Sequence, residues 1–151
     1  MSIILALHAL AAVVWVGGMF FAVVCLRPST SWMDGPVRLR LWAHVLSRFF
    51  RWVGLAAAVL LGTGLYIVLG HIGSLRAAGS HVHIMFALGL VMMLMAAHVY
   101  FAPYKRLKRF VTTGNWAEAG KQMQQIRLFI NFNLALGLVV VVVGSGGRFW
   151  H

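Results

Sequence analysis

The chain has 151 residues, of which 62% are hydrophobic and 10% are charged, and its mean hydropathy is +0.88. Water-soluble domains carry roughly 45–50% apolar and about 25% charged residues, so the composition excludes a water-soluble domain and indicates a membrane protein. The net charge is +11, from 13 Lys and Arg against 2 acidic residues.

Four apolar stretches are long enough to cross a bilayer, which takes about 20 residues. The first is too long for a signal-peptide core of roughly 7–15 apolar residues and is expected to stay as a helix. The helix of the second is expected to begin near Pro36, because Asp34, Gly35 and Pro36 form a helix start. We predict an all-α, polytopic four-helix bundle that forms one transmembrane domain over residues 1–151, with spans at residues 3–26, 52–69, 83–102 and 128–144.

The basic residues lie mainly in two connections, the one after the first span and the one after the third. Eleven of the thirteen are there, and only Arg76 and Arg148 lie elsewhere. Basic connections stay in the cytoplasm, so both termini are predicted to be extracytoplasmic, in a bacterial inner membrane with the lipid bilayer as partner. Nucleic-acid binding is not expected, because the charges flank spans and no recognition motif accompanies them. Residues 115–125 are predicted to form a short amphipathic surface helix before the fourth span.

The reactive side chains of the chain are mainly its seven histidines. Cys25 is the one cysteine, and no C-x-x-C-H motif occurs, so an internal disulfide and a c-type haem are excluded. In the predicted topology His8 and His83 lie at similar depth near the outer face, because each is a few residues into its span. His71 lies near the same level and closer to water, and His81 is on a different helical face from His83. Together His8 and His83 could supply two imidazoles to one metal.

Small residues follow His8 along one face of the first span at helical spacing. They would let a flat macrocycle approach the backbone, with Trp15 against its edge. The alternative is that they are ordinary small-residue contacts between membrane helices. The stripe contains Ala11, Ala12, Trp15, Gly18 and Ala22.

Further polar side chains lie toward the inner end. His98 is fifteen residues beyond His83, roughly 22 Å along the helix, where no partner ligand is expected, so a hydrogen-bonded interior histidine is favoured over a ligand. Arg127 and Asn131 share a face of the fourth span. They could pair with His98 or hold an acidic group such as a propionate or a carboxylate, or Arg127 could be one more interfacial charge. A methionine-lined copper path has weak support, because no single stripe contains Met85, Met92, Met93 and Met95.

Several short motifs occur in the order found in one membrane family. They are His8 with Trp15 and Gly17-Gly18, a basic inner connection, His81-Val82-His83-Ile84-Met85 opening the third span, His98 near its end, and Arg127 opening the fourth. Together they resemble the CopD superfamily, which includes the copper-resistance membrane protein CopD and is similar to the HemJ-type protoporphyrinogen oxidases. The resemblance covers about residues 5–144.

The resemblance to the HemJ type implies four membrane helices, b-type haem and oligomers. It implies that His8 corresponds to the first-span histidine, and that His83 stands where the HemJ type has a lysine. After Arg127 the HemJ type carries an Asn-Glu-Pro-like run, whereas this chain has Leu-Phe-Ile-Asn-Phe-Asn. That departure argues against oxidation of a porphyrinogen.

The main hypothesis is a cytochrome b-like protein that transfers electrons, with haem b between His8 and His83; weaker ligand candidates are His81, His71 and His98. Two imidazoles close both axial positions of the iron, which suits electron transfer. Quinol or a redox partner protein would exchange the electrons, and bare glycines and alanines on the spans favour a homo-oligomer.

Three alternatives stay open at this point. The first is a HemJ-type protoporphyrinogen oxidase that uses the same haem. The second is a CopD-type copper uptake or transport protein, since imidazole suits copper as well as iron; its ligands would be His8, His71, His81 and His83. The third is an assembly subunit with no cofactor, whose histidines serve helix contacts.

Overall fold

The computed structural model describes residues 2–73 and 78–146. Over this part of the chain the secondary structure is entirely helical, and four helical segments are long and apolar enough to cross a membrane. The predicted all-α fold with four spans is confirmed. The four segments are Ser2–Ser29, Gly35–Gly70, Ser80–Thr112 and Trp116–Gly146.

Three of the four segments change helix type along their length, from α to the wider π form. The second segment starts directly after Asp34, with Pro36 in its first turn, as the sequence predicted. The elements are α1 (Ser2–Phe20), η1 (Phe21–Leu26), α2 (Arg27–Ser29), α3 (Gly35–Ile67), η2 (Val68–Ile72), α4 (Ser80–Val99), η4 (Tyr100–Tyr104), α5 (Lys105–Thr112) and α6 (Trp116–Gly146), where η marks π-helical segments.

The third segment does not stop at Pro103, which follows the predicted span. Proline has no N–H to donate to the preceding turn, and the chain passes it within the π-helical η4. Wider turns of this kind accommodate a local break in the hydrogen-bond pattern. The helix therefore continues to Thr112 and carries the basic residues of α5 with it.

The helix predicted at residues 115–125 is confirmed, but its position at the surface is wrong. These residues form the first turns of α6, where the Asn115 side-chain oxygen accepts the N–H of Glu118 at 3.3 Å and caps the helix. Ala119, Gln122 and Met123 are buried in the bundle. The polar composition of the segment concealed this apolar face.

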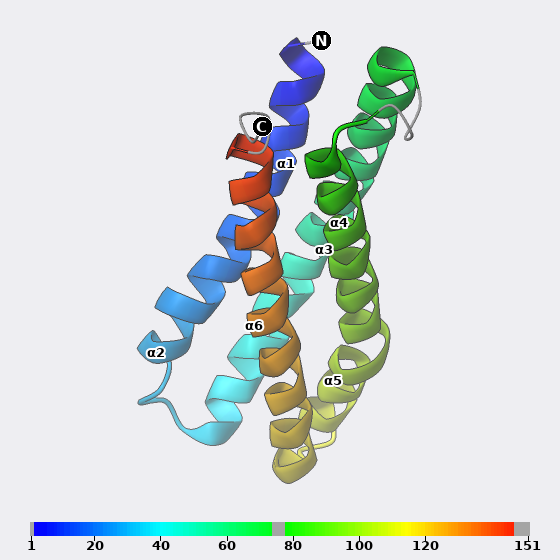
Figure 1. The fold of residues 1–151 in the computed structure, drawn as a ribbon. Coiled ribbons are helices and arrows are strands. Elements are labelled where there is room, and N and C mark those ends of the chain that lie inside the picture. Colours follow the sequence, from blue (N-terminus) through cyan, green and yellow to red (C-terminus); the bar gives the residue numbers. More distant parts are fainter. Residues whose placement is uncertain (1, 74–77, 147–151) are drawn as a thin grey trace.

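The start of α1, the end of α3, the start of α4 and the end of α6 all lie at one end of the bundle (Figure 1). This arrangement agrees with the predicted topology, and we call this end the outer end and the opposite one the inner end. The most extensive contacts join α1 to α3 and α4 to α6. Because α6 also contacts α1, α3 and α5, it is the central helix of the bundle.

The tightest core lies in the inner half of the bundle. Leu107, Ala119 and Ile126 are fully buried there, and Leu46 is nearly so. Many large apolar side chains elsewhere face outward, among them Leu10, Leu94 and Phe132, as expected of helices whose surroundings are lipid. The most tightly packed core is therefore in the inner half, and the outer half contains His8, His81 and His83.

Candidate functional site

His8 lies on α1 and makes its hydrogen bond to α3. Its Nδ1 is 2.7 Å from Thr63 Oγ1, and the Thr63 hydroxyl already donates to the carbonyl of Val59 at 2.6 Å. A hydroxyl has one hydrogen, so this network assigns the proton of His8 to Nδ1, which donates to Thr63. The Nε2 atom of His8 then keeps its lone pair, the form in which imidazole binds a metal.

The histidines that open α4 gather around Gly79. The Nδ1 of exposed His83 lies 3.2 Å from the Gly79 carbonyl oxygen, which only accepts, so Nδ1–H donates. The half-buried His81 ring is so close that a Cβ on Gly79 would be 2.8 Å from its Cε1. His81 and His83 thus lie around one glycine, whereas the hydrogen bond of His8 goes to α3.

The two remaining histidine candidates lie elsewhere. His98 is exposed, with its ring centroid 5.1 Å from that of Phe129, so the prediction of a hydrogen-bonded interior histidine is wrong: position 98 is on the outward side of α4. His71 belongs to η2, and its side chain lies outside the described residues. Among the described residues no group of three or more His, Cys, Asp or Glu could hold a metal.

The small-residue stripe after His8 is buried against other helices. Trp15 is 2% exposed, Ala11 is buried and Ala12 is half-buried. A Cβ on Gly18 would meet the Phe49 ring at 2.8 Å, so an aromatic side chain of α3 fills the space beside that glycine. This packing does not fit a planar macrocycle at the stripe, and haem ligation by His8 and His83 stays a prediction.

Two methionine side chains of α4 pack against glycines of α6. The sequence analysis missed this contact. A Cβ on Gly144 would lie 3.1 Å from Met85 Cε, and a Cβ on Gly137 would lie 3.1 Å from Met92 Cε. Met85 and Met92 are seven residues apart, as are the two glycines, so the helices contact each other in a regular antiparallel register. The signal in the sequence was the seven-residue spacing of the two methionines together with the same spacing of the two glycines.

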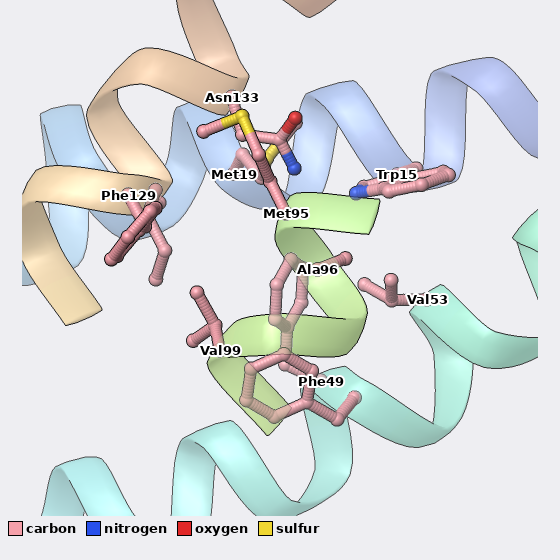
Figure 2. A pocket seen from close by; sticks show the side chains of 11 residues that line it. Trp15, Met19, Phe49, Val53, Met95, Ala96, Val99, Phe129 and Asn133 are labelled. Carbon is pink, nitrogen blue, oxygen red and sulfur yellow. The ribbon is translucent and has the colours of Figure 1, made fainter. Parts of the chain in front are cut away.

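Inward of Met92, a cavity of about 20 Å³ lies between α1, α3, α4 and α6. It has room for about one water-sized atom. Met19 of α1 and Met95 of α4 both line it (Figure 2). We call Met85, Met92, Met95 and Met19 the thioether seam. The other lining residues are Trp15, Phe49, Phe50, Val53, Ala96, Val99, Phe129, Ile130 and Asn133.

Asn133 is the only polar side chain of that lining apart from the Trp15 indole. It is 5% exposed, its amide N–H donates to the Met92 carbonyl at a long 3.4 Å, and its Oδ1 is buried with no hydrogen-bond donor. Figure 2 shows its amide at the same end of the cavity as the two thioethers. A buried acceptor without a donor is rare in proteins and calls for an explanation.

A second, smaller cavity of about 10 Å³ lies toward the inner end. Two N–H groups of its lining residues, Trp42 Nε1 and Arg127 Nε, are buried without an acceptor. Arg127 and Asn131 therefore do share a site, as the sequence suggested. The lining residues are Ala22, Val23, Arg27, Trp42, Met123, Arg127, Ile130 and Asn131.

Comparison with protein families gives one match, to the family described as Copper resistance protein D, over residues 43–146, which are 104 of the 151 residues. The chain belongs to the CopD family. The CopD match includes α4, α5, α6 and most of α3, and therefore His83, Met92 and Asn133. It leaves α1 with His8 outside. No curated protein and no solved structure matches the chain, and the likeness to the HemJ type stays a prediction.

Proposed function

We propose that this CopD-family protein carries copper across the membrane, with Cu(I) passing through the thioether-lined interior of the bundle. The observation that carries the proposal is the thioether seam, which runs inward along α4 and reaches the cavity beside Asn133. Thioether sulfur is a soft ligand that selects Cu(I) over harder cations such as Mg²⁺ or Ca²⁺. The family description, Copper resistance protein D, agrees with this cargo.

The charge of the cavity lining also suits Cu(I). It contains no carboxylate, so a divalent ion would lose its water there without a negative partner. A singly charged ion loses less hydration energy, and the unpaired Oδ1 of Asn133 can offer it an oxygen beside the sulfurs of Met19 and Met95. Cu(I) would thus give the buried Oδ1 of Asn133 a partner that the packing of the helices does not provide.

The outer end carries imidazoles that would receive copper. The hydrogen bonds of His8 and His83 each engage Nδ1, which leaves both Nε2 atoms with a lone pair for a metal. Imidazole suits copper, and a partner on the other ring nitrogen is the usual support for a histidine ligand. Copper would pass from these side chains to the thioethers of α4.

The test is Cu(I) uptake into proteoliposomes that contain the purified protein, with a Cu(I) chelator trapped inside. A Met19→Leu, Met95→Leu double variant keeps the apolar volume and is expected to lower the uptake rate about tenfold, the effect of roughly 1.4 kcal/mol of lost binding. Met93→Leu is the matched control, because Met93 is a neighbouring methionine of α4 that does not line the cavity.

Two results would overturn the proposal. One is wild-type uptake no faster than in empty liposomes, and the other is equal loss in the double variant and in Met93→Leu. A reduced-minus-oxidised visible spectrum of the same preparation tests the haem hypothesis separately. A stoichiometric Soret band that is lost in His8→Ala would favour haem b over copper as the metal centre.

A further inference from the structure

The second, smaller cavity, which we call the inner cavity, lies close to basic side chains of three helices. Arg27 of α2 and Arg127 of α6 both line it, and Arg38 of α3 is near enough that its charge, like that of Arg27, repels the Arg127 guanidinium. The guanidinium of Arg38 donates to the Ser31 carbonyl at 3.2 Å, a neutral partner. Like charges in a partly buried place are unfavourable unless an anion accompanies them.

Two buried donors lie in the same cavity without an acceptor. The indole of Trp42 is 3% exposed, and its Nε1–H has no partner; the Nε–H of Arg127 is likewise buried and unpaired. Both groups only donate hydrogen bonds. They need an acceptor, and the guanidinium charge favours an acceptor that is negatively charged.

The chain offers no carboxylate for this purpose. It has two acidic residues, Asp34 and Glu118; Asp34 is exposed and Glu118 is half-buried, and neither lines the cavity. Glu118 is paired with Lys121 on the outside of α6. An anion that accepts from these donors would therefore come from another molecule.

The size and position of the cavity indicate the chemistry of that anion. A volume of about 10 Å³ has room for about one water-sized atom, hence for one oxygen of a larger group. Arg27 and Asn131 are exposed, so the remainder of the group can stay at the bundle surface beside them. The cavity also lies at the predicted cytoplasmic end, where basic pockets between membrane helices meet lipid headgroups.

We propose that the inner cavity binds a phosphate group, one oxygen of which accepts from Trp42 Nε1 and Arg127 Nε while the others face Arg27 and Asn131. The phosphate belongs to an anionic phospholipid headgroup or is free in solution, and the chemistry of the site is the same for both. The phosphate proposal does not depend on copper. The inner cavity shares only Ile130 with the larger cavity beside Asn133, which we call the outer cavity.

The test uses the purified protein, without copper, in nanodiscs of phosphatidylcholine that contain a minor fraction of phosphatidylglycerol. Native mass spectrometry of the released protein measures the retained lipid. We expect the wild type to enrich phosphatidylglycerol about thirtyfold over the bulk ratio, because each of two basic groups near a lipid surface contributes roughly a factor of five. Trp42→Phe, which removes the donor and keeps an aromatic ring, and Arg27→Gln, at an exposed position, are each expected to lose most of this enrichment.

Arg109→Gln is the matched control, because it removes one exposed charge at the same end but outside the cavity. In pure phosphatidylcholine nanodiscs, inorganic phosphate that raises the unfolding temperature of the wild type but not of Arg27→Gln would identify free phosphate as the ligand. Enrichment that survives in both Trp42→Phe and Arg27→Gln would overturn the proposal. So would the absence of both enrichment and a phosphate effect in the wild type.

Discussion

The two cavities of this bundle differ in the kind of polar atom that they leave unpaired. The outer cavity has an acceptor, Asn133 Oδ1, in a lining that also contains two thioethers. The inner cavity has two donors, on Trp42 and Arg127, among guanidinium groups. An unpaired acceptor with soft sulfur neighbours suits a soft cation, and unpaired donors with positive neighbours suit an anion.

The difference also bears on how a cation would leave the bundle. Arg27, Arg38 and Arg127 together oppose a positive ion at the inner end. A phosphate bound among them would offset part of that charge. The copper path and the phosphate site can therefore be tested separately, and three variants do so.

The largest effect is expected from Gly137→Leu. A Cβ there would be 2.9 Å from Val16 and 3.1 Å from Met92, so a larger side chain forces α1 and α4 away from α6 and should lower the free energy of unfolding by about 3 kcal/mol. Denaturant unfolding in detergent measures this change. Copper uptake should fall with it, while phosphatidylglycerol enrichment should remain, because Gly137 does not line the inner cavity.

Gly89→Leu is the control for that variant, because a Cβ on this glycine of α4 would have no neighbour within 4 Å. It should change the unfolding free energy little. Equal stability of the Gly137→Leu and Gly89→Leu proteins would contradict the close helix contact at Gly137.

The next effect concerns the imidazole of His8. Thr63→Val removes the hydroxyl that accepts its Nδ1–H, so the tautomer and the ring orientation are no longer fixed, and Cu(I) affinity should fall about tenfold. Competition with a coloured Cu(I) chelator measures the affinity. Thr63→Ser keeps the hydroxyl and should bind as the wild type does; a Val variant with wild-type affinity would exclude this role of Thr63.

The smallest effect is on stability, and it has the opposite sign. Asn133→Leu replaces a poorly satisfied buried amide with an apolar side chain of similar size and should raise the unfolding free energy by about 1 kcal/mol, while copper uptake falls. Thermal unfolding and uptake are measured on the same preparation. A variant that is more stable and transports normally would show that Asn133 has no part in transport.

Much of the fold was predictable from the sequence. The apolar stretches predicted four spans, and Asp34 with Pro36 predicted the early start of α3, because hydropathy and helix-start chemistry are local properties. The surface position of the helix at residues 115–125 was wrong because its polar residues conceal a buried face. The prediction of an interior position for His98 was wrong, because which face of a helix packs inward depends on the neighbouring helices.

The candidate site was predictable only in part. The heptad spacing of Met85 and Met92 is visible in the sequence, but it becomes meaningful only beside the same spacing of Gly137 and Gly144 on an antiparallel helix. The hydrogen bond between His8 and Thr63 joins residues 55 positions apart, and no local pattern contains it. The sequence thus allowed a contact of His8 with a neighbouring helix, but it could not identify Thr63 as the partner.

Hydropathy and charge act residue by residue, so the amino-acid sequence is enough to establish a four-span helical membrane protein with most of its positive charge in two connections. Which helix faces meet depends on the folded bundle, since small residues such as Gly18 and Gly137 allow several partners until packing selects one. That choice left the Asn133 oxygen among thioethers and the Trp42 and Arg127 donors among arginines. Unpaired polar atoms arise from packing, because a polar atom lacks a partner only when all of its neighbours are in place.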